Sequence, residues 1–170
     1  MKEYFFEDRE VVDIDDLKSE KMPKEDYIKA HKSLVIFCHD IFIEYNDGIL
    51  LVIRKEFPAK GILWPIGGRV LRGYSVEDSL RLKVKEECGL EIEDIKGLGC
   101  ARTFFKTDPF GHGKGTDSIN FVYFAKGKGE LRLDELHEKP MIVSKEKYKE
   151  IRDDLHPYIR DFMDKVIEMF

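Results

Sequence analysis

Residues 67–90 read GGRVLRGYSVEDSLRLKVKEECGL, and this stretch decides the fold. The run from Ser75 to Asp78 has the form of a capping box, and Gly89 is the residue type that ends helices, so a helix of about four turns is predicted between them. At about 100° per residue, its apolar positions share one face that must be buried, namely Val76, Leu80, Val84 and Cys88. Glu87 falls inside this apolar face.

A carboxylate on a buried helix face needs compensation, because taking an ionised group out of water is costly. Lys83, one turn earlier, offers an ion pair with Glu86 or Glu87, and a bound metal ion is the alternative, to which Glu86 could also contribute. The preceding tripeptide Gly67–Arg69 supplies a glycine pair that lets a ligand approach the backbone and an arginine that can bind phosphate. Glycines, carboxylates and arginine together favour a site for a metal ion and a diphosphate.

The rest of the chain alternates extended and helical patterns. Asn46-Asp47-Gly48 is a strong turn signal between two apolar runs and predicts a β-hairpin. Extended segments are predicted at residues 34–45, 49–54, 62–66, 95–106, 118–126, 130–136 and 141–144, and helices at 23–32, 75–89, 145–155 and 158–169. The pattern predicts an α+β fold, a mixed β-sheet sandwiched between helices. We expect residues 22–170 to form this domain and residues 1–21, acidic and weakly patterned, to be an N-terminal extension that packs on it or on a partner subunit.

Length and composition fit one domain. Hydrophobic residues make up 42% of the 170 residues, which is enough for a core, and no apolar run is long enough to span a membrane. The net charge of -5 argues against a nucleic-acid partner. The cysteines Cys38, Cys88 and Cys100 lie in apolar stretches without C-x-x-C spacing and predict buried thiols in a reducing compartment. Residues 1–8 lack the apolar run of a signal peptide, so we expect a cytoplasmic protein.

Residues 68–90 resemble the Nudix box. In that pattern a glycine is followed after five residues by Glu, then after seven by Arg-Glu, an apolar residue, any residue, Glu-Glu, any residue, Gly and an apolar residue. The chain departs from it at Tyr74, where the first Glu is expected, and at Leu82-Lys83, which stands for Arg-Glu. It keeps Gly68, Val84, Glu86, Glu87, Gly89 and Leu90. The resemblance implies the Nudix fold and a metal-dependent hydrolase, and Lys83 in place of a carboxylate favours one Mg²⁺ over a multi-ion cluster.

A wider resemblance, over residues 22–165, is to the GDP-mannose mannosyl hydrolases. It rests on residues 54–61, 64–70, 115–117 and 134–137. In that family water attacks the anomeric carbon of a nucleotide-sugar and releases GDP and the sugar with inversion. The resemblance therefore implies a nucleotide-sugar or another nucleoside diphosphate derivative as the small-molecule partner. It also implies a homodimer with the N-terminal segment near its interface.

The resemblance also assigns metal-binding and catalytic roles. Glu87 and the Gly67 carbonyl would hold Mg²⁺, with Mn²⁺ as an alternative ion and Glu86 as a further candidate ligand. His137 would be the general base, because an imidazole titrates near neutral pH and can take a proton from water. The family has a Gln metal ligand just before this base, and the chain has Leu136 there.

Substrate contacts follow from the same resemblance. Arg54 and Arg69 would neutralise the diphosphate leaving group, Asp40 would contact the nucleotide-sugar, and Phe121 would match the aromatic residue that contacts the base. An active-site His of the family is replaced near Thr103.

Simpler interpretations of these residues stay open. His137 could be a surface histidine, Arg54 a solvated charge, and Asp40 a side chain that points out of the sheet. The segment 108–115, which contains His112 and Lys114, is either a substrate lid or a mobile hairpin loop.

Three functions remain in competition at this point. The first is hydrolysis of a nucleotide-sugar at the sugar carbon, and the second is pyrophosphatase attack at phosphorus. Heavy oxygen from labelled water would enter the sugar in the first case and phosphate in the second. The third is a catalytically silent nucleotide-binding module, which the departures at Tyr74, Lys83 and Leu136 would explain.

Overall fold

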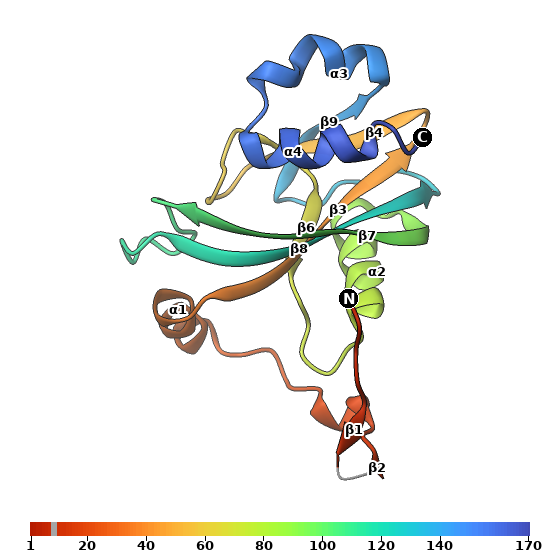
Figure 1. Cartoon of the computed structure of the whole chain (residues 1–170). Helices are drawn as coiled ribbons and strands as arrows, with labels where there is room; N and C mark the ends of the chain where they lie inside the picture. Colours follow the sequence, from red (N-terminus) through yellow and green to blue (C-terminus); the bar gives the residue numbers. More distant parts are fainter. Residues whose placement is uncertain (8–9) are drawn as a thin grey trace.

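The structure is a computed structural model that describes residues 1–7 and 10–170. Within this described part, seven strands form a sheet in the order β5-β4-β3-β8-β7, with β6 paired to β3 and β9 paired to β4 (Figure 1). The β3–β8 pair is parallel and the other pairs are antiparallel, so the sheet is mixed. These strands are β3 (Ile36–Tyr45), β4 (Gly48–Arg54), β5 (Leu63–Trp64), β6 (Ile66–Arg69), β7 (Glu91–Phe105), β8 (Thr116–Lys128) and β9 (His137–Val143).

Helices cover both faces of the sheet, which confirms the predicted α+β class. On one face α3 (Lys145–Ile151), the short 3-10 turn η2 (Arg152–Asp154) and α4 (Pro157–Val166) pack over a buried cluster that includes Phe42, Val122 and Phe124. On the other face α2 (Val76–Cys88) packs over Ile41, Ile43 and their neighbours. Figure 1 shows α4 and α2 on opposite sides of the strands. None of the described helices is long and apolar enough to cross a membrane.

The caps and the buried face of α2 are as the sequence predicts. The Ser75 hydroxyl accepts the Asp78 N–H, and Gly89 ends the helix with φ 74°, a conformation that glycine adopts without strain. The whole apolar stripe is buried, and Glu87 is 8% exposed within it. The helix therefore carries its carboxylate into the protein, as its spacing predicts.

The sheet splits beside β3, and this split positions the site. β4 pairs with β3 from Ile43 to Tyr45, and β6 pairs with the same edge of β3 from Cys38 to Ile41. Beyond the hairpin, β4 turns away to pair with β5 and β9. An opening is left between β6 and the β4–β9 pair, and side chains from the α2 face can reach the α4 face there.

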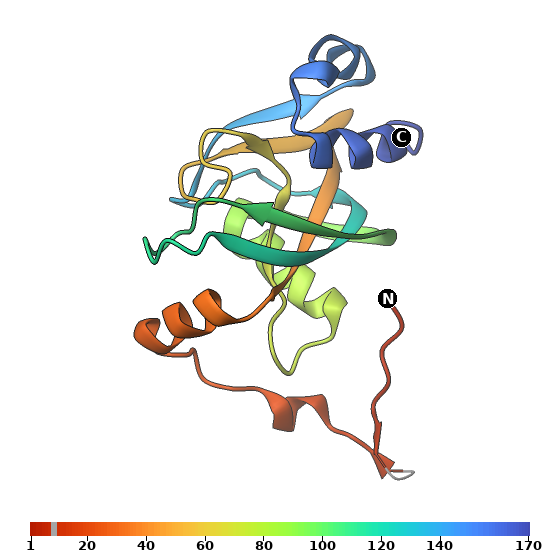
Figure 2. The ribbon, with the colours of Figure 1, turned by 60° about the vertical axis from the view of Figure 1, so that its left-hand side comes forward.

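The N-terminal segment contacts the domain, which is one of the two packing partners expected for it. It contains β1 (Phe6–Glu7), β2 (Glu10–Val11) and the 3-10 turn η1 (Ile14–Leu17), and α1 (Lys24–Ser33) follows (Figure 2). A Glu3 carboxylate oxygen accepts the N–H of Val76 at the start of α2, and the Lys18 ammonium lies 4.5 Å from the Tyr74 ring centre. These contacts join the segment to the α2 N-terminus.

Some local predictions were wrong. Residues 130–136 were expected to be extended but contain no strand, because their backbone passes over the end of α2, where Arg132 and Asp134 N–H groups bond to the Cys88 and Glu87 carbonyls.

The prediction of three buried thiols holds for one cysteine. Cys88 is a buried thiol as predicted, whereas Cys38 is half-buried and Cys100 is exposed. Cys100 pairs with Phe121 between β7 and β8, near the edge of the sheet, where its apolar neighbours in sequence do not cover it.

Candidate active site

A cavity of about 470 Å³ lies on the α4 face at the split in the sheet. Its volume is within the range of small-molecule sites. Strands β3, β7 and β8 form its floor, α1 and the β7–β8 loop form one wall, and β4, β6, β9 and the end of α2 form the other. Among the predicted site residues it brings together Asp40, Arg54, Gly67, Arg69, Glu87 and His137.

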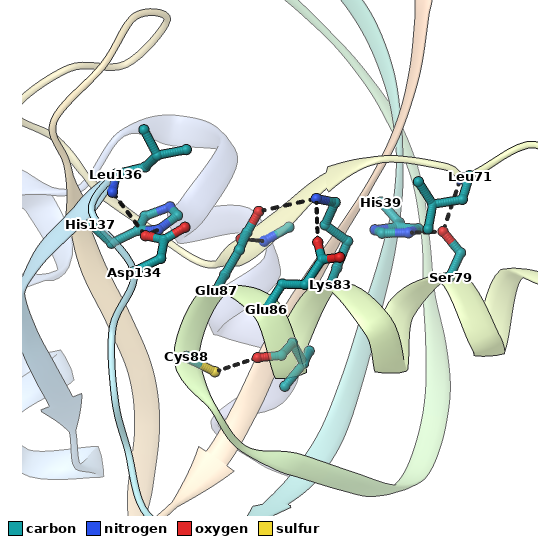
Figure 3. A network of polar contacts seen from close by, with 12 residues as sticks. His39, Leu71, Ser79, Lys83, Glu86, Glu87, Cys88, Asp134, Leu136 and His137 are labelled. Atoms are coloured by element: carbon teal, nitrogen blue, oxygen red, sulfur yellow. Dashed lines mark hydrogen bonds and ion pairs between the residues drawn. The ribbon is translucent and has the colours of Figure 1, made fainter. Parts of the chain in front are cut away.

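Glu87 reaches this cavity from the opposite side of the sheet. Its Oε2 accepts the Gly67 N–H at 3.2 Å, and its Oε1 lies 3.9 Å from the Lys83 ammonium, which is closer to Glu86 at 3.1 Å. Figure 3 shows the carboxylate between Lys83 and the His137–Asp134 pair. Burial raises the pKa of Glu87 to about 7, although Lys83 and the Gly67 N–H oppose the shift. The protein therefore does not fully compensate this carboxylate by its own groups.

Close packing requires glycine at position 67 but not at position 68. A Cβ on Gly67 would lie 2.3 Å from the His39 carbonyl oxygen, so β6 can pair this closely with β3 only with glycine there. A Cβ on Gly68 would meet Lys83 at 3.5 Å and Glu87 at 3.6 Å, which are ordinary contacts. Because the Gly67 N–H bonds to Glu87 and not to β3, antiparallel geometry directs its carbonyl to the same side.

His137 is a cavity residue and not a surface histidine. Its side chain is 6% exposed, and its Nδ1 lies 2.7 Å from Oδ1 of Asp134. The carboxylate also accepts the Leu136 N–H at 2.9 Å, so Asp134 is itself held in place (Figure 3). A carboxylate oxygen accepts, so in the neutral imidazole Nδ1 carries the proton and Nε2 has the lone pair. This arrangement can hold a general base.

Cationic side chains border the same cavity. Arg54 lies opposite His137 in the β4–β9 pair, and its buried Nε has no hydrogen-bond partner among the described residues. The Arg69 guanidinium lies 3.8 Å from the centre of the Tyr27 ring, so α1 fixes its position by a cation–π contact. With Lys83, these groups supply three cationic side chains of the kind that bind a diphosphate, and the carboxyls of Asp40, Glu56 and Glu87 line the same cavity.

Asp40 lies on the floor and does not point out of the sheet into water. Tyr158 of α4 donates to its Oδ2 at 2.5 Å, and the Tyr158 ring is stacked on Trp64 with centres 5.1 Å apart. Burial raises the pKa of Asp40 to about 6, against the opposing effects of the Tyr158 hydrogen bond and of Arg54. Asp40 is thus a buried carboxylate beside the cavity without an ion-pair partner at contact distance among the described residues.

Some predicted site residues lie elsewhere. Phe121 is on the α2 face, stacked with Phe37 at 6.4 Å, because alternate residues of β8 point to opposite faces. Its neighbour Asn120 lines the cavity in its place. The Glu86 side chain is 62% exposed, pairs with Lys83 and does not line the cavity. Leu136, at the position of the family's Gln, is half exposed at the rim.

The segment 108–115 is fastened to α1. The Asp108 carboxylate accepts N–H groups of Phe110, His112 and Gly113, and the His112 ring bonds to His31 of α1 at 2.8 Å. Phe110 packs edge-on against the rings of His31 and Tyr27. The loop is therefore anchored and supplies part of the cavity wall, with Pro109 as a lining residue.

The sequence did not assign a role to several cavity residues. Ser118 and Asn120 are buried polar residues of the floor, and Tyr27 and Trp64 are aromatic residues of the walls. Thr103, named above only as the place near which a family histidine is replaced, is a third polar residue of the floor. For the floor residues a signal was present, because polar side chains recur at every second position of β8 before Val122 and Phe124. Nothing near Tyr27 in the sequence indicates that it would contact Arg69.

The donors suit one divalent ion and not a cluster. Among residues 1–7 and 10–170, no group of three or more His, Cys, Asp or Glu side chains is placed to hold a metal. Glu87 is a buried, incompletely compensated carboxylate that would suit one Mg²⁺, which commonly takes one or two protein ligands and completes its shell with water and substrate phosphate. Lys83 stands where another carboxylate ligand would be needed for a second ion.

Fold and site together define an α+β protein whose cavity combines a buried helix carboxylate, a glycine pair and three cationic side chains. The family model of the NUDIX domain matches residues 39–166, and the chain belongs to this family. It is a Nudix hydrolase by family, and its box carries Lys83 among the carboxylates.

Relatives and solved structures agree with this assignment. The chain is 30% identical over 150 residues to the ADP-ribose pyrophosphatase of Methanocaldococcus jannaschii, covering 85% of this chain and 84% of the relative. It is 23% identical over 153 residues to the low-salt glycan biosynthesis protein Agl8 of Haloferax volcanii, covering 88% and 93%. The MutT Nudix hydrolase of Burkholderia pseudomallei superposes with TM-score 0.57 at 25% identity, covering 67% of this chain and 86% of that one. A Nudix hydrolase of Clostridium perfringens gives 0.61 at 18%, covering 80% and 98%, and shares the fold.

Proposed function

We propose that this chain hydrolyses a nucleotide-sugar with one bound Mg²⁺ or Mn²⁺, by attack of water at the anomeric carbon. The observation that carries the proposal is that Glu87, His137, Arg54 and Arg69, from four separate elements, border one cavity. A binding module would need the cations, but it would not need a buried histidine oriented by a carboxylate.

His137 acts as the base in this reaction. Its Nε2 takes a proton from water while Asp134 holds Nδ1–H and stabilises the imidazolium that forms. The water oxygen bonds to the anomeric carbon, and the bond from that carbon to the phosphate oxygen breaks. The phosphate oxygen keeps the electron pair of the broken bond and leaves as part of the nucleoside diphosphate.

The cationic groups stabilise the leaving diphosphate. Arg69, held on Tyr27, and Arg54, whose buried Nε is free to donate, supply directed N–H groups. Glu87 and the Gly67 carbonyl would hold the divalent ion, which when bound neutralises charge on the diphosphate. Because both arginines neutralise negative charge on the leaving diphosphate, a single divalent ion is enough to neutralise the rest.

A second candidate is attack at phosphorus, which would release a nucleoside monophosphate and a sugar phosphate. It is favoured by the 30% identity to a protein named as an ADP-ribose pyrophosphatase. The proposal at carbon is favoured by the His137–Asp134 pair and accords with the glycan biosynthesis named for the other relative.

Turnover in ¹⁸O-labelled water separates the candidates. GDP-mannose and ADP-ribose are each incubated with the protein and Mg²⁺, and the products are identified by mass spectrometry. Label in the free sugar, with a nucleoside diphosphate as the other product, supports the proposal. Label in a phosphate product moves the assignment to the pyrophosphatase, and binding without turnover at any Mg²⁺ or Mn²⁺ concentration identifies a silent module.

A further inference from the structure

A row of neutral polar side chains crosses the cavity floor. Ser118 and Asn120 on β8 and Thr103 on β7 point into the cavity and are 5%, 5% and 8% exposed. Thr103 and Ser118 are direct partners in the β7–β8 pair. We call Thr103, Ser118 and Asn120 the polar strip.

The polar strip gives way to apolar residues on the same face of β8. Further along β8, Val122 and Phe124 point to the same face and pack in the core beneath α4. Polarity changes at the residue where α4 ceases to cover the strand and the cavity begins. Buried hydroxyl and amide groups cost stability relative to apolar ones unless they are hydrogen-bonded, so the core alone does not account for them.

The strip is internally ordered and keeps spare hydrogen-bonding capacity. Asn120 Nδ2 donates to Thr103 Oγ1 at 2.9 Å, and Thr103 and Ser118 share a hydrogen bond of 2.9 Å. No other side-chain hydrogen bond of the strip is found among the described residues. A hydroxyl can donate once and accept twice, and a primary amide can donate twice and accept twice. Asn120 thus retains a donor and its acceptors, and whichever of the Thr103 and Ser118 hydroxyls accepts in their shared bond retains its O–H donor.

The strip faces the cationic side across β3. Cys38 of β3 pairs with Asn120 on one side and with Arg69 on the other. Two strand spacings, about 10 Å, therefore separate Asn120 from Arg69. A ring joined to a diphosphate at Arg69 and Glu87 can therefore reach the strip.

We propose that the polar strip is a subsite for a sugar ring of the substrate, which it holds through the ring hydroxyls. This inference rests on the proposed function and specifies one part of its ligand. Hydroxyl groups match the strip because they donate and accept together, and the strip carries no charge that would select a phosphate or a carboxylate. The ring is either the distal sugar or the ribose of the nucleoside.

Binding to variants of the strip tests the subsite. Ser118→Ala and Thr103→Val are each made in a His137→Ala background, which slows turnover but keeps the metal carboxylate. Affinities for GDP, GDP-mannose and 2′,3′-dideoxy-GDP are measured by calorimetry with Mg²⁺. Loss of one neutral hydrogen bond should weaken binding of the recognised ring about five- to tenfold.

Ser79→Ala is the matched control. Ser79 is a fully buried hydroxyl that bonds to His39 at 2.8 Å and accepts the Leu71 N–H, but it lies on the α2 side of the sheet. The Ser79→Ala variant loses a comparable buried hydroxyl without changing the cavity floor. All three affinities should therefore stay within twofold of those of the His137→Ala parent.

The pattern across ligands decides the proposal. Weaker GDP-mannose binding with unchanged GDP binding assigns the strip to the distal sugar. Weaker binding of GDP and GDP-mannose with unchanged binding of the dideoxy compound assigns it to the ribose. Equal loss for all three ligands, no loss for any, or the same losses in Ser79→Ala would overturn the subsite.

Failure of the subsite differs from failure of the proposed activity. If nucleotide-sugars bind and the strip variants weaken them, but labelled water is never incorporated, the hydrolase is wrong and the subsite stands. If hydrolysis proceeds in Ser118→Ala and Thr103→Val with an unchanged KM, the hydrolase stands and the subsite is wrong. No binding of any of the three ligands overturns both.

Discussion

Asp40 and Asp164 make the same short hydrogen bond in different places. Tyr158 donates to Asp40 at 2.5 Å on the cavity floor, and Tyr148 donates to Asp164 at 2.5 Å between α3 and α4. Asp164 is also held by Arg152, with Nε and Nη2 at 2.9 and 2.6 Å from its oxygens. Asp164 is half exposed, whereas Asp40 is buried.

The pKa shifts of these carboxyls have opposite signs. The Arg152 hydrogen bond, followed by that of Tyr148, lowers the pKa of Asp164, and burial raises the pKa of Asp40 to about 6. Glu87 behaves like Asp40, since burial raises its pKa to about 7. Protein groups therefore stabilise the negative charge of the carboxylate between α3 and α4. The two carboxyls at the cavity lack such partners and are available to a ligand or an ion.

Glu87→Gln should have the largest effect on activity. The amide cannot carry the charge that holds a divalent ion, so turnover should fall by about 10³ or more. Thermal unfolding should remain cooperative, because the amide retains the shape and can still accept the Gly67 N–H. If Glu87→Gln at saturating Mg²⁺ has the same turnover as the parent protein, Glu87 is not a metal ligand of the active site.

Asp40→Asn should alter the pH dependence of stability. Below pH about 4 the carboxyl is protonated in both folded and unfolded chains, and as pH rises to about 6 the folded state retains a proton that the unfolded state releases. Stability of the parent should therefore fall relative to the variant over this range, by roughly 3 kcal/mol at about 1.4 kcal/mol for each pH unit. Urea unfolding between pH 4 and 8 measures this difference. A constant difference would contradict the unpaired state of Asp40.

His137→Ala should lower turnover by about 10² if the imidazole is the base. Asp134→Asn should have a smaller effect, about tenfold, because the imidazole remains but loses its orientation and charge partner. Pre-steady-state rates under saturating nucleotide-sugar measure both. If His137→Ala and the parent protein have equal turnover, the His137–Asp134 pair has a structural role and not a catalytic one.

Asp164→Asn should affect stability modestly and activity little. The ion pair with Arg152 is half exposed, so its loss should lower the Tm by about 2 to 4 °C at pH 7. Because its pKa is lowered, Asp164 stabilises the fold above pH about 4, and that contribution is lost as pH falls through the folded-state value. The slope with pH is thus opposite to that of Asp40. A kcat changed more than threefold would mean that this region also serves the site.

The His31–His112 contact should give a local effect of acid. His112 Nδ1 accepts the Lys114 N–H, so its Nε2–H donates to His31, which must be unprotonated at Nδ1. Burial, followed by the nearby His112, lowers the pKa of His31, and the contact is therefore stable above pH about 6.5 and lost as pH falls. Amide exchange at Phe110, His112 and Gly113, corrected for intrinsic rates, should quicken between pH 7 and 5. His112→Gln should remove this dependence, while the Tyr148 amide of α3 serves as an unaffected reference.

Local patterns predicted the elements well. The α2 helix followed from its caps and its apolar stripe, and the β3–β4 hairpin followed from Asn46 and Asp47, which adopt φ of 49° and 62°. Burial of Glu87 followed from its place in the stripe. These features depend on residues close together in the sequence.

The missed features depend on long-range pairing. The resemblance assigned Phe121 to the base contact, whereas the structure places its side chain on the α2 face, away from the cavity; a shift of one residue along a strand moves a side chain to the opposite face. The polar strip was not predicted, because it forms only where β7 and β3 pair with β8. Asp134 as partner of His137 was missed because that segment was predicted to be extended, which would separate the two side chains.

The cavity wall supplied by α1 lies ahead of residues 39–166, the part that the family model matches. Tyr27 and His31 of this helix fix an arginine and a loop that both border the cavity. A substitution in this ten-residue helix would therefore act on Arg69 and on the β7–β8 loop as well as on the wall itself.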